Sequence, residues 1–266
     1  MNWSEKEILF LRENYYNKGS RFCSNKLNRT ENAIIHKASR LKIIGSMIQH
    51  RKYTYNSSIF SIINPYNSYW AGFIAADGCV YYSKKSNNNY AVLKLNLSIK
   101  DKNILTNFIN FSNYTGKYTE YIKTDKKKAV RIHIENPIEW ILNLNKYWNI
   151  TSRKSLTLRP PNLTKREDIL SYIIGYIDGD GCFHKDYNKY LRLQIIGTKE
   201  VLTWINNQFN NIGSIYKKHV NTNKNTYILY FGGKNVKNIC IELNTHIKKY
   251  NLIVLERKWN KTQELL

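Results

Sequence analysis

The chain has 266 residues and a formal net charge of +23, from 42 lysine and arginine residues against 19 aspartate and glutamate residues. This excess, in a chain with 42% hydrophobic residues, describes a folded protein whose partner is a polyanion. No apolar run approaches the length of a membrane span, and the basic residues form no amphipathic membrane stripe, so nucleic acid is the favoured polyanion.

The N-terminal residues, 1–45, predict a small domain of three helices. Ser4, followed by glutamate three residues later, has the spacing of a capping box and starts the first helix. A break at Gly19 separates it from a short second helix, and Thr30 is a suitable N-cap for a third helix over 31–41. The inner stripe of this third helix is apolar, and its outward face is polar and basic: Asn32, His36, Lys37 and Arg40.

Three short helices with such a third helix resemble the helix-turn-helix family, especially its Myb/SANT-like branch. In that family the third helix enters the major groove of DNA. The alternative is a small helical bundle that contacts another protein. Residues 46–66 then form a basic, tyrosine-rich segment without a clear period, which we interpret as a linker along a phosphate backbone or as an amphipathic tether.

Two stretches of the remaining chain share one pattern, an apolar run with small residues that ends in Asp-Gly. They are WAGFIAADG at 70–78 and IIGYIDGDG at 173–181. One copy alone would be read as a strand entering a hairpin, because Asp-Gly is a common turn. As helices, both copies place small residues one turn apart, which lets two backbones come close together. Side by side, such helices would put Asp77 and Asp180 next to each other, in outline a divalent-metal site.

The elements after each motif repeat as well, and Asp77 lies 103 residues before Asp180. Alternating and periodic patterns predict, in the first copy, strands over 80–85, 90–99, 117–123 and 129–135 and helices over 101–111 and 137–147. In the second copy they predict strands over 182–186, 190–196, 214–219 and 226–231 and helices over 199–209 and from about 235. We therefore expect an α+β fold with two αββαββα repeats, over 67–158 and 169–266 with a linker at 159–168, after a small three-helix domain.

The two motifs and the order of elements that they open resemble the LAGLIDADG homing endonucleases in their single-chain, two-repeat form. Ala75, Ile174 and Gly179 depart from the family pattern. The resemblance implies pseudo-symmetric antiparallel saddle-shaped sheets over the DNA, and a monomer that cuts both strands of a long site to leave short 3′ overhangs. It assigns Asp77 and Asp180 as catalytic metal ligands, with Mg²⁺ as the expected ion. The main-chain carbonyls of Ala76 and Gly179 would help to hold it, while Asp178 is structural or supports the ligands.

A basic residue near the metals is also a family feature, at the junction of the last strand and the following helix. Lys234 stands there in the second copy and Asn136 in the first, so we assign Lys234 a catalytic role, with an ordinary phosphate contact as the alternative. Two basic pairs recur near the ends of the copies, and we expect them to contact the phosphate backbone. They are Arg153 with Lys154 and Arg257 with Lys258.

Base recognition is expected from the outward faces of the strands, because Arg, Lys, Asn and Gln pair with base edges in the major groove. The residues that we expect to bind DNA there are Lys94, Asn96, Ser98, Arg131, His133, Arg192 and Gln194.

The sequence is also compatible with two rival functions. One is an intron RNA-splicing maturase that binds its own intron RNA, although the separate helix-turn-helix domain favours duplex DNA. The other is a DNA-binding regulator that does not cut, although retention of both aspartates argues against it.

The cysteines and the N-terminus bear on the compartment. Cys23, Cys79, Cys182 and Cys240 are far apart and predict buried apolar residues in a reducing compartment, with no zinc site or disulfide. The N-terminus lacks a signal-peptide pattern. We expect the cytoplasm of a bacterial or phage host, or an organellar matrix, and no secretion.

Overall fold

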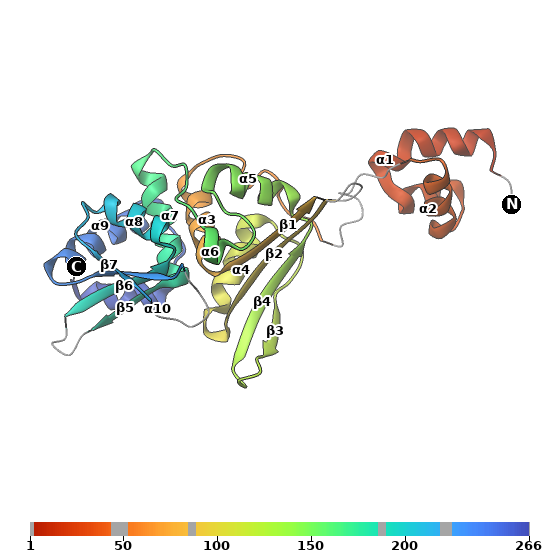
Figure 1. Cartoon of the computed structure of the whole chain (residues 1–266). Helices are drawn as coiled ribbons and strands as arrows, with labels where there is room; N and C mark the ends of the chain where they lie inside the picture. The colour runs from red at the N-terminus through yellow and green to blue at the C-terminus, as the bar shows by residue number, and fades with distance from the viewer. Residues whose placement is uncertain (1–2, 44–52, 85–88, 186–189, 219–224, 266) are drawn as a thin grey trace. The chain divides into compact units, whose positions relative to one another are not determined.

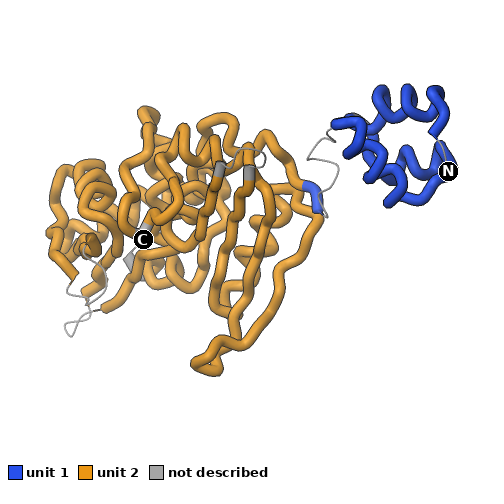
Figure 2. Tube along the Cα trace, turned by 45° about the vertical axis from the view of Figure 1, so that its right-hand side comes forward, with its two compact units in different colours: residues 1–54 blue, residues 55–266 orange. Residues whose placement is uncertain are grey.

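The computed structural model describes residues 3–43, 53–84, 89–185, 190–218 and 225–265. They form two compact units, Met1–Thr54 and Tyr55–Leu266, which Figure 2 shows in different colours. Residues 46–52 of the predicted linker lie outside the described ranges. Within these ranges, no helix has the length and apolar character needed to cross a membrane.

The N-terminal unit contains the three predicted helical segments. α1 (Glu5–Leu27) has a kink at Gly19, whose φ of 77° separates its first segment from its second, and α2 (Glu31–Arg40) follows. Ser4 begins α1 with the predicted capping box, and the Thr30 side chain caps α2. The segments enclose a small core of five buried residues, Leu11, Tyr15, Cys23, Ile34 and Ala38.

The second unit has the αββαββα order twice, so the predicted α+β fold is confirmed (Figure 1). The first repeat consists of α3 (Pro65–Asp77), β1 (Gly78–Lys84), β2 (Asn89–Ser98), α4 (Lys102–Ser112), β3 (Thr119–Ile122), β4 (Lys128–Glu135) and α5 (Ile138–Trp148). The second consists of α7 (Arg166–Asp180), β5 (Gly181–Lys185), β6 (Leu191–Gly197), α8 (Lys199–Gln208), β7 (Ser214–Lys217), β8 (Tyr227–Phe231) and α9 (Lys234–Tyr250).

A short helix follows each repeat, and the sequence did not predict either one. These are α6 (Lys154–Thr157) and α10 (Glu256–Trp259), and short 3₁₀ turns occupy Ile99–Asp101 and Asn260–Leu265. Four residues are barely one turn, so they display no helical period in a sequence.

Each repeat contains one four-stranded antiparallel sheet, in the orders β1-β2-β4-β3 and β5-β6-β8-β7. The predicted alternation of β2 is confirmed, since Leu93, Leu95 and Leu97 are buried while Asn96 and Ser98 are exposed. One face of each sheet therefore packs on helices, and the opposite face carries the polar residues of the strands.

Part of the segment that we interpreted as a linker packs on the first repeat. Phe60 is fully buried, with its ring edge-on to Trp140 and Trp148. The Trp140 indole donates a hydrogen bond of 2.8 Å to the Asn56 carbonyl, and the Tyr55 hydroxyl donates one of 2.9 Å to the Glu139 carboxylate. Isolated aromatic residues show no period, so the sequence alone did not reveal this packing.

The two motif helices, α3 and α7, pack along each other at the centre of this unit. A methyl group on Gly72 would lie 2.0 Å from the carbonyl oxygen of Tyr172, and one on Gly175 would lie 1.9 Å from the carbonyl oxygen of Tyr69. Both distances are far inside van der Waals contact, so the helices touch through their backbones. This is the close approach that the spacing of small residues predicted.

The prediction of buried cysteines is wrong for two of the four. Cys23 and Cys240 are buried, but Cys79 and Cys182 are exposed free thiols. Each of these two is the second residue of its strand, β1 or β5. The next residue, Val80 or Phe183, is buried on the core face. The alternation of the strand therefore turns both thiols to the outer face of the sheet.

Candidate active site

Asp77 and Asp180 are the last residues of α3 and α7, and a strand begins at the glycine that follows each of them. The ends of the two helices are in contact, because a methyl group on Gly179 would lie 2.2 Å from Ala76 Cβ and 3.2 Å from the Asp77 nitrogen. The fold thus brings two carboxylates from opposite repeats to the same end of one helix pair.

The electrostatic environment of the two carboxylates disfavours their charged forms. Burial raises the pKa of Asp180 to about 6, and the negative charge of Asp77 raises it as well. Burial also raises the pKa of Asp77, although Lys258 and Lys154 act in the opposite direction. Two neighbouring carboxylates in this position are more stable with a cation between them.

Lys154 and Lys258 are the basic residues that the structure places beside the acids. The Lys154 ammonium donates hydrogen bonds to the carbonyls of Ala75, at 2.7 Å, and of Ala76. The Lys258 ammonium donates to the carbonyls of Ile177 and Gly179, both at 2.9 Å, and to that of Asp178.

Each lysine therefore caps the end of one motif helix, where carbonyls lack partners. We predicted both as phosphate contacts, but their side chains are buried, with only 8% of Lys154 and 7% of Lys258 exposed. Burial lowers the pKa of both ammonium groups, and the neighbouring aspartates oppose this shift.

The chemistry of this site suits a divalent cation with oxygen ligands. Asp77 and Asp180 end the two helices, and the carbonyls of Ala76 and Gly179 belong to the residues just before them. Each of these carbonyls keeps a second lone pair beside the one that a lysine uses. Among the described residues no three His, Cys, Asp or Glu side chains form a metal cluster, so the two aspartates would need carbonyls or water to complete a coordination sphere. A cavity of about 180 Å³, lined by Asp180, Lys154 and Thr198, opens beside them.

Comparison with known proteins shows the same architecture. A family model described as LAGLIDADG endonuclease matches residues 70–159. The solved structure of the LAGLIDADG homing endonuclease I-GzeII in complex with its DNA target aligns with a TM-score of 0.51 at 14% identity, over 77% of this chain and 89% of that chain. The chain has the LAGLIDADG homing endonuclease fold, as two repeats in one chain.

Two further structures with the LAGLIDADG fold are similar to it. I-LtrWI bound to target DNA aligns at 15% identity and a TM-score of 0.49, over 77% of this chain and 89% of that chain. I-CpaMI bound to uncleaved DNA aligns at 14% identity and a TM-score of 0.49, over 77% of this chain and 90% of that chain. No curated protein matches the chain.

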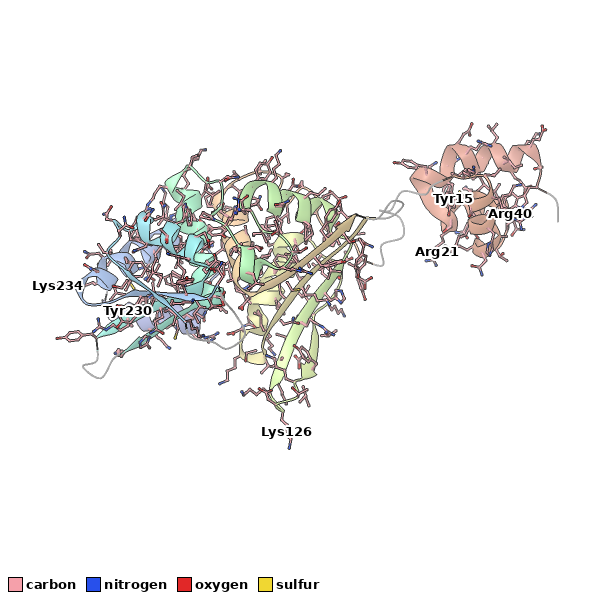
Figure 3. The ribbon with its side chains drawn as sticks, in the orientation of Figure 1. Tyr15, Arg21, Arg40, Lys126, Tyr230 and Lys234 are labelled. Atoms are coloured by element: carbon pink, nitrogen blue, oxygen red, sulfur yellow. The ribbon has the colours of Figure 1, made fainter. Side chains whose placement is uncertain are left out.

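Lys234, our candidate for the basic residue near the metals, is exposed at the first position of α9. Figure 3 shows it in the second repeat. The lysines whose charges act on the two aspartates are Lys154, Lys258 and Lys218, and Lys234 is not one of them. The sequence signal that could have found Lys154 and Lys258 is their nearly equal distance from the acids, 77 residues after Asp77 and 78 after Asp180.

Asp178 has a structural role in this LAGLIDADG fold, as we expected. It is 1% exposed and accepts hydrogen bonds from the Tyr69 hydroxyl and the Trp259 indole, both at 2.8 Å, and from the Leu255 nitrogen at 3.1 Å. Burial raises its pKa to about 6, and these hydrogen bonds act against the shift. Asp178 thereby ties α3 and the C-terminal segment to α7.

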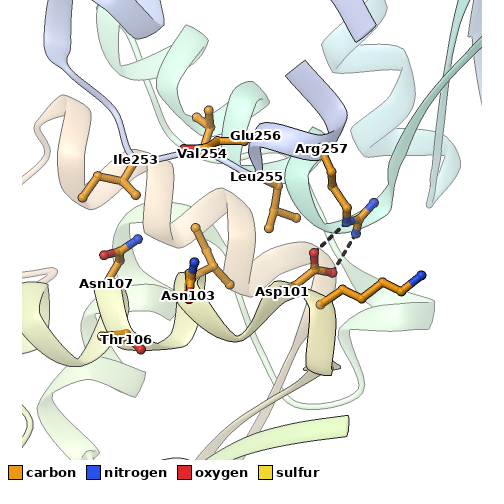
Figure 4. Close-up of a pocket in the computed structure, with 11 residues that line it drawn as sticks. Asp101, Asn103, Thr106, Asn107, Ile253, Val254, Leu255, Glu256 and Arg257 are labelled. Atoms are coloured by element: carbon orange, nitrogen blue, oxygen red, sulfur yellow. Dashed lines mark hydrogen bonds and ion pairs between the residues drawn. The ribbon is translucent and has the colours of Figure 1, made fainter. Parts of the chain in front are cut away.

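Arg257, a predicted phosphate contact, instead joins the two repeats. Its guanidinium donates two hydrogen bonds to the Asp101 carboxylate, at 2.6 and 2.7 Å (Figure 4). Asp101 is 7% exposed, and its charge raises the pKa of Asp77. Sequence reasoning missed this partner, because an aspartate at the start of a helix usually serves that helix. Arg153, which occupies the equivalent place in the first repeat, is exposed.

The residues proposed to read bases lie on the outer faces of the sheets. Asn96, Ser98 and Arg131 are exposed, and the others are half-buried: Lys94, His133, Arg192 and Gln194. In the N-terminal unit, Asn32, His36 and Arg40 of α2 are exposed, as expected. Lys37 is half-buried, because its ammonium lies 5.7 Å from the centre of the Trp3 ring.

Replacing tyrosine with phenylalanine at two equivalent positions gives a test of the helix pair. The 103-residue period relates Tyr69 to Tyr172 and Asp178 to Ala75. Tyr69 therefore has its carboxylate partner, whereas the buried Tyr172 hydroxyl has no hydrogen-bond partner among the described residues. We expect Tyr69→Phe to lower the free energy of unfolding by about 1.5–3 kcal/mol, and Tyr172→Phe to change it by less than about 0.5 kcal/mol. Urea titration of the two matched variants measures both; equal losses would contradict the assignment.

Proposed function

We propose that this protein is a site-specific, metal-dependent endonuclease that hydrolyses both strands of a long duplex DNA site. The observation that carries the proposal is the juxtaposition of Asp77 and Asp180 at the touching ends of α3 and α7. A protein that only binds DNA gains nothing from two close carboxylates beside phosphates, because their charges repel the backbone unless a cation intervenes. The net charge of +23 supplies the attraction for the rest of the duplex.

In this proposal Asp77 and Asp180 would hold Mg²⁺, with the carbonyls of Ala76 and Gly179 as additional oxygen ligands. A bound Mg²⁺ would supply charge stabilisation and an acidified water for phosphodiester hydrolysis. Lys154 and Lys258 fix the ends of the two helices, and during cleavage their positive charges would stabilise the negative charge that grows beside them. The role of Lys234 is then a contact to the phosphate backbone away from the reacting bond.

The outer faces of the two sheets would bind the duplex on either side of the acids. The side chains there include amides, hydroxyls, lysines, arginines and a histidine, which suit base edges and phosphates. The I-GzeII structure, which shares the fold, was determined in complex with a DNA target. Short 3′ overhangs are the expected product.

Incubation with a library of random duplexes tests the proposed activity. We expect double-strand breaks at one family of sites with Mg²⁺ and no breaks with a chelator, and sequencing of the ends gives the cut positions. If duplexes were bound but left intact both with Mg²⁺ and with the chelator, the result would favour a DNA-binding regulator that does not cut. Preferential recovery of a structured RNA over every duplex would favour the maturase.

The N-terminal unit is proposed to add affinity through α2. Its exposed polar residues Asn32, His36 and Arg40 suit a helix in the major groove. We expect removal of residues 1–45 to weaken binding to the selected site by about ten- to a hundredfold, which corresponds to losing a few phosphate and base contacts. Electrophoretic mobility shifts measure the affinity, and metal-dependent cutting should persist at high protein concentration. Unchanged affinity after truncation would show that this unit contacts something other than DNA.

A further inference from the structure

The outer faces of the two sheets can be compared position by position, because their strand registers match. Gly78 pairs with Leu95 in the first sheet, and Gly181 pairs with Ile195 in the second. Asn96 therefore corresponds to Ile196. Following the register across three strands gives a polar row in the first sheet, Asn96, Arg131 and Thr119, and an apolar row in the second, Ile196, Ile228 and Tyr216.

The apolar row faces outward and not into the core. Ile195 and Leu229, the strand neighbours of Ile196 and Ile228, are fully buried, so alternation turns both isoleucines to the opposite face. Tyr216 is 59% exposed, and none of the three belongs to the hydrophobic core of the unit or packs against it. Ile196 and Ile228 are half-buried, whereas all three members of the polar row are exposed. The two sheets thus present different chemistry at equivalent places.

The apolar row lies close to the proposed catalytic acids. Ile196 lines the cavity that Asp180 and Lys154 also line. Lys218, two residues after Tyr216, is close enough for its positive charge to lower the pKa of Asp180. A duplex held over the acids would pass over this row. The basic residues Arg192, Lys217 and Lys218 on neighbouring positions of the same repeat match the charge of DNA.

We propose that the apolar row recognises thymine methyl groups in the major groove of the half-site bound by the second repeat. The methyl group of thymine is the only apolar group that base edges show in that groove, and it suits isoleucine and tyrosine side chains. The polar row instead presents an amide and a guanidinium, which pair with adenine and guanine. The target is therefore asymmetric in chemistry, with thymines opposite the apolar row. This inference rests on the proposed function and adds the class of base that one half of the site recognises.

Replacing single thymines of the selected site with deoxyuridine tests the inference, because only the methyl group is removed. Binding is measured with a chelator present, so cleavage is not needed. We expect about fourfold weaker binding at each thymine under the apolar row, the factor equivalent to about 0.8 kcal/mol for one buried methyl group. The loss at the thymine that Ile228 contacts should vanish in the Ile228→Ala protein and persist in the matched Asn96→Ala protein.

Placing the polar row on the second sheet gives a second test, which measures a change of base preference and not a decrease in affinity. The triple variant Ile196→Asn, Ile228→Arg and Tyr216→Thr gives the second sheet the polar row of the first. When the selection is repeated with this variant, we expect the thymines under the row to be replaced by the bases that the first repeat prefers at its equivalent positions. Deoxyuridine effects that are equal in wild type and Ile228→Ala would overturn the inference while leaving a DNA-binding protein. Dimers that Ile228→Arg converts to monomers, without a change in base preference, would assign the row to contact between copies. Failure to select any duplex would overturn the proposed function itself.

Discussion

Asp77→Asn and Asp180→Asn are each expected to lower double-strand cleavage by about a thousandfold or more, while the affinity for the DNA site is kept or increased. The amide keeps the shape of the side chain but removes the charge that would hold Mg²⁺. It also removes a negative charge from a surface that faces phosphates, which is why binding should not suffer. Cleavage of a plasmid that carries the selected site, with binding measured in parallel, gives both quantities.

The same substitutions are expected to lower cleavage but to raise the stability of the folded protein. Burial raises the pKa of both carboxylates, so in the absence of metal the folded protein holds each charge at a cost that the unfolded chain avoids. We expect Asp180→Asn to raise the free energy of unfolding at neutral pH by about 1–2 kcal/mol when measured with a chelator. A loss of stability would instead show that the Asp180 carboxylate makes contacts that hold the fold together.

Gly72→Ala and Gly175→Ala are expected to lower the free energy of unfolding by about 2–4 kcal/mol. In an exposed helix the same change would raise the free energy of unfolding by about 1 kcal/mol. A decrease would therefore by itself indicate that the two helices are in contact at these glycines. The added methyl groups would lie 2.0 and 1.9 Å from main-chain carbonyl oxygens of the opposite helix, which cannot move unless α3 and α7 separate. Urea titration followed by tryptophan fluorescence suits the measurement, because Trp3 is the only one of the six tryptophans outside the second unit.

Gly179 provides a matched control for this backbone contact. A methyl group on Gly179 would lie 2.2 Å from Ala76 Cβ, so the obstacle is a side-chain methyl group on the equivalent residue of the other helix. We expect Gly179→Ala to destabilise the protein and the double variant Gly179→Ala with Ala76→Gly to recover most of the loss. No change at Ala76 should rescue Gly72→Ala. Equal rescue of both variants would contradict contact between backbones at Gly72.

The sequence by itself determined most of the local structure and the repetition of the fold. Alternation of leucines with polar residues from Leu93 to Ser98 gives a half-buried strand whatever lies around it, because the side chains of a strand point to opposite faces. The capping box at Ser4 and the cap at Thr30 act over three residues, so they too could be predicted. The recurrence of Asp-Gly after a helix with small residues was sufficient to suggest two helices in contact and two neighbouring acids.

Only the tertiary structure decided which charged residues surround the acids. Lys154 and Lys258 carry no local signal that distinguishes them from other basic residues, and they cap the motif helices only because the chain returns to those helices after each repeat. The ion pair of Arg257 with Asp101 joins residues of different repeats, and the packing of Phe60 on Trp140 joins a presumed linker to a helix. Local patterns depend on a few neighbouring residues, whereas these contacts depend on where distant segments meet, and that is fixed by the packing of the whole unit.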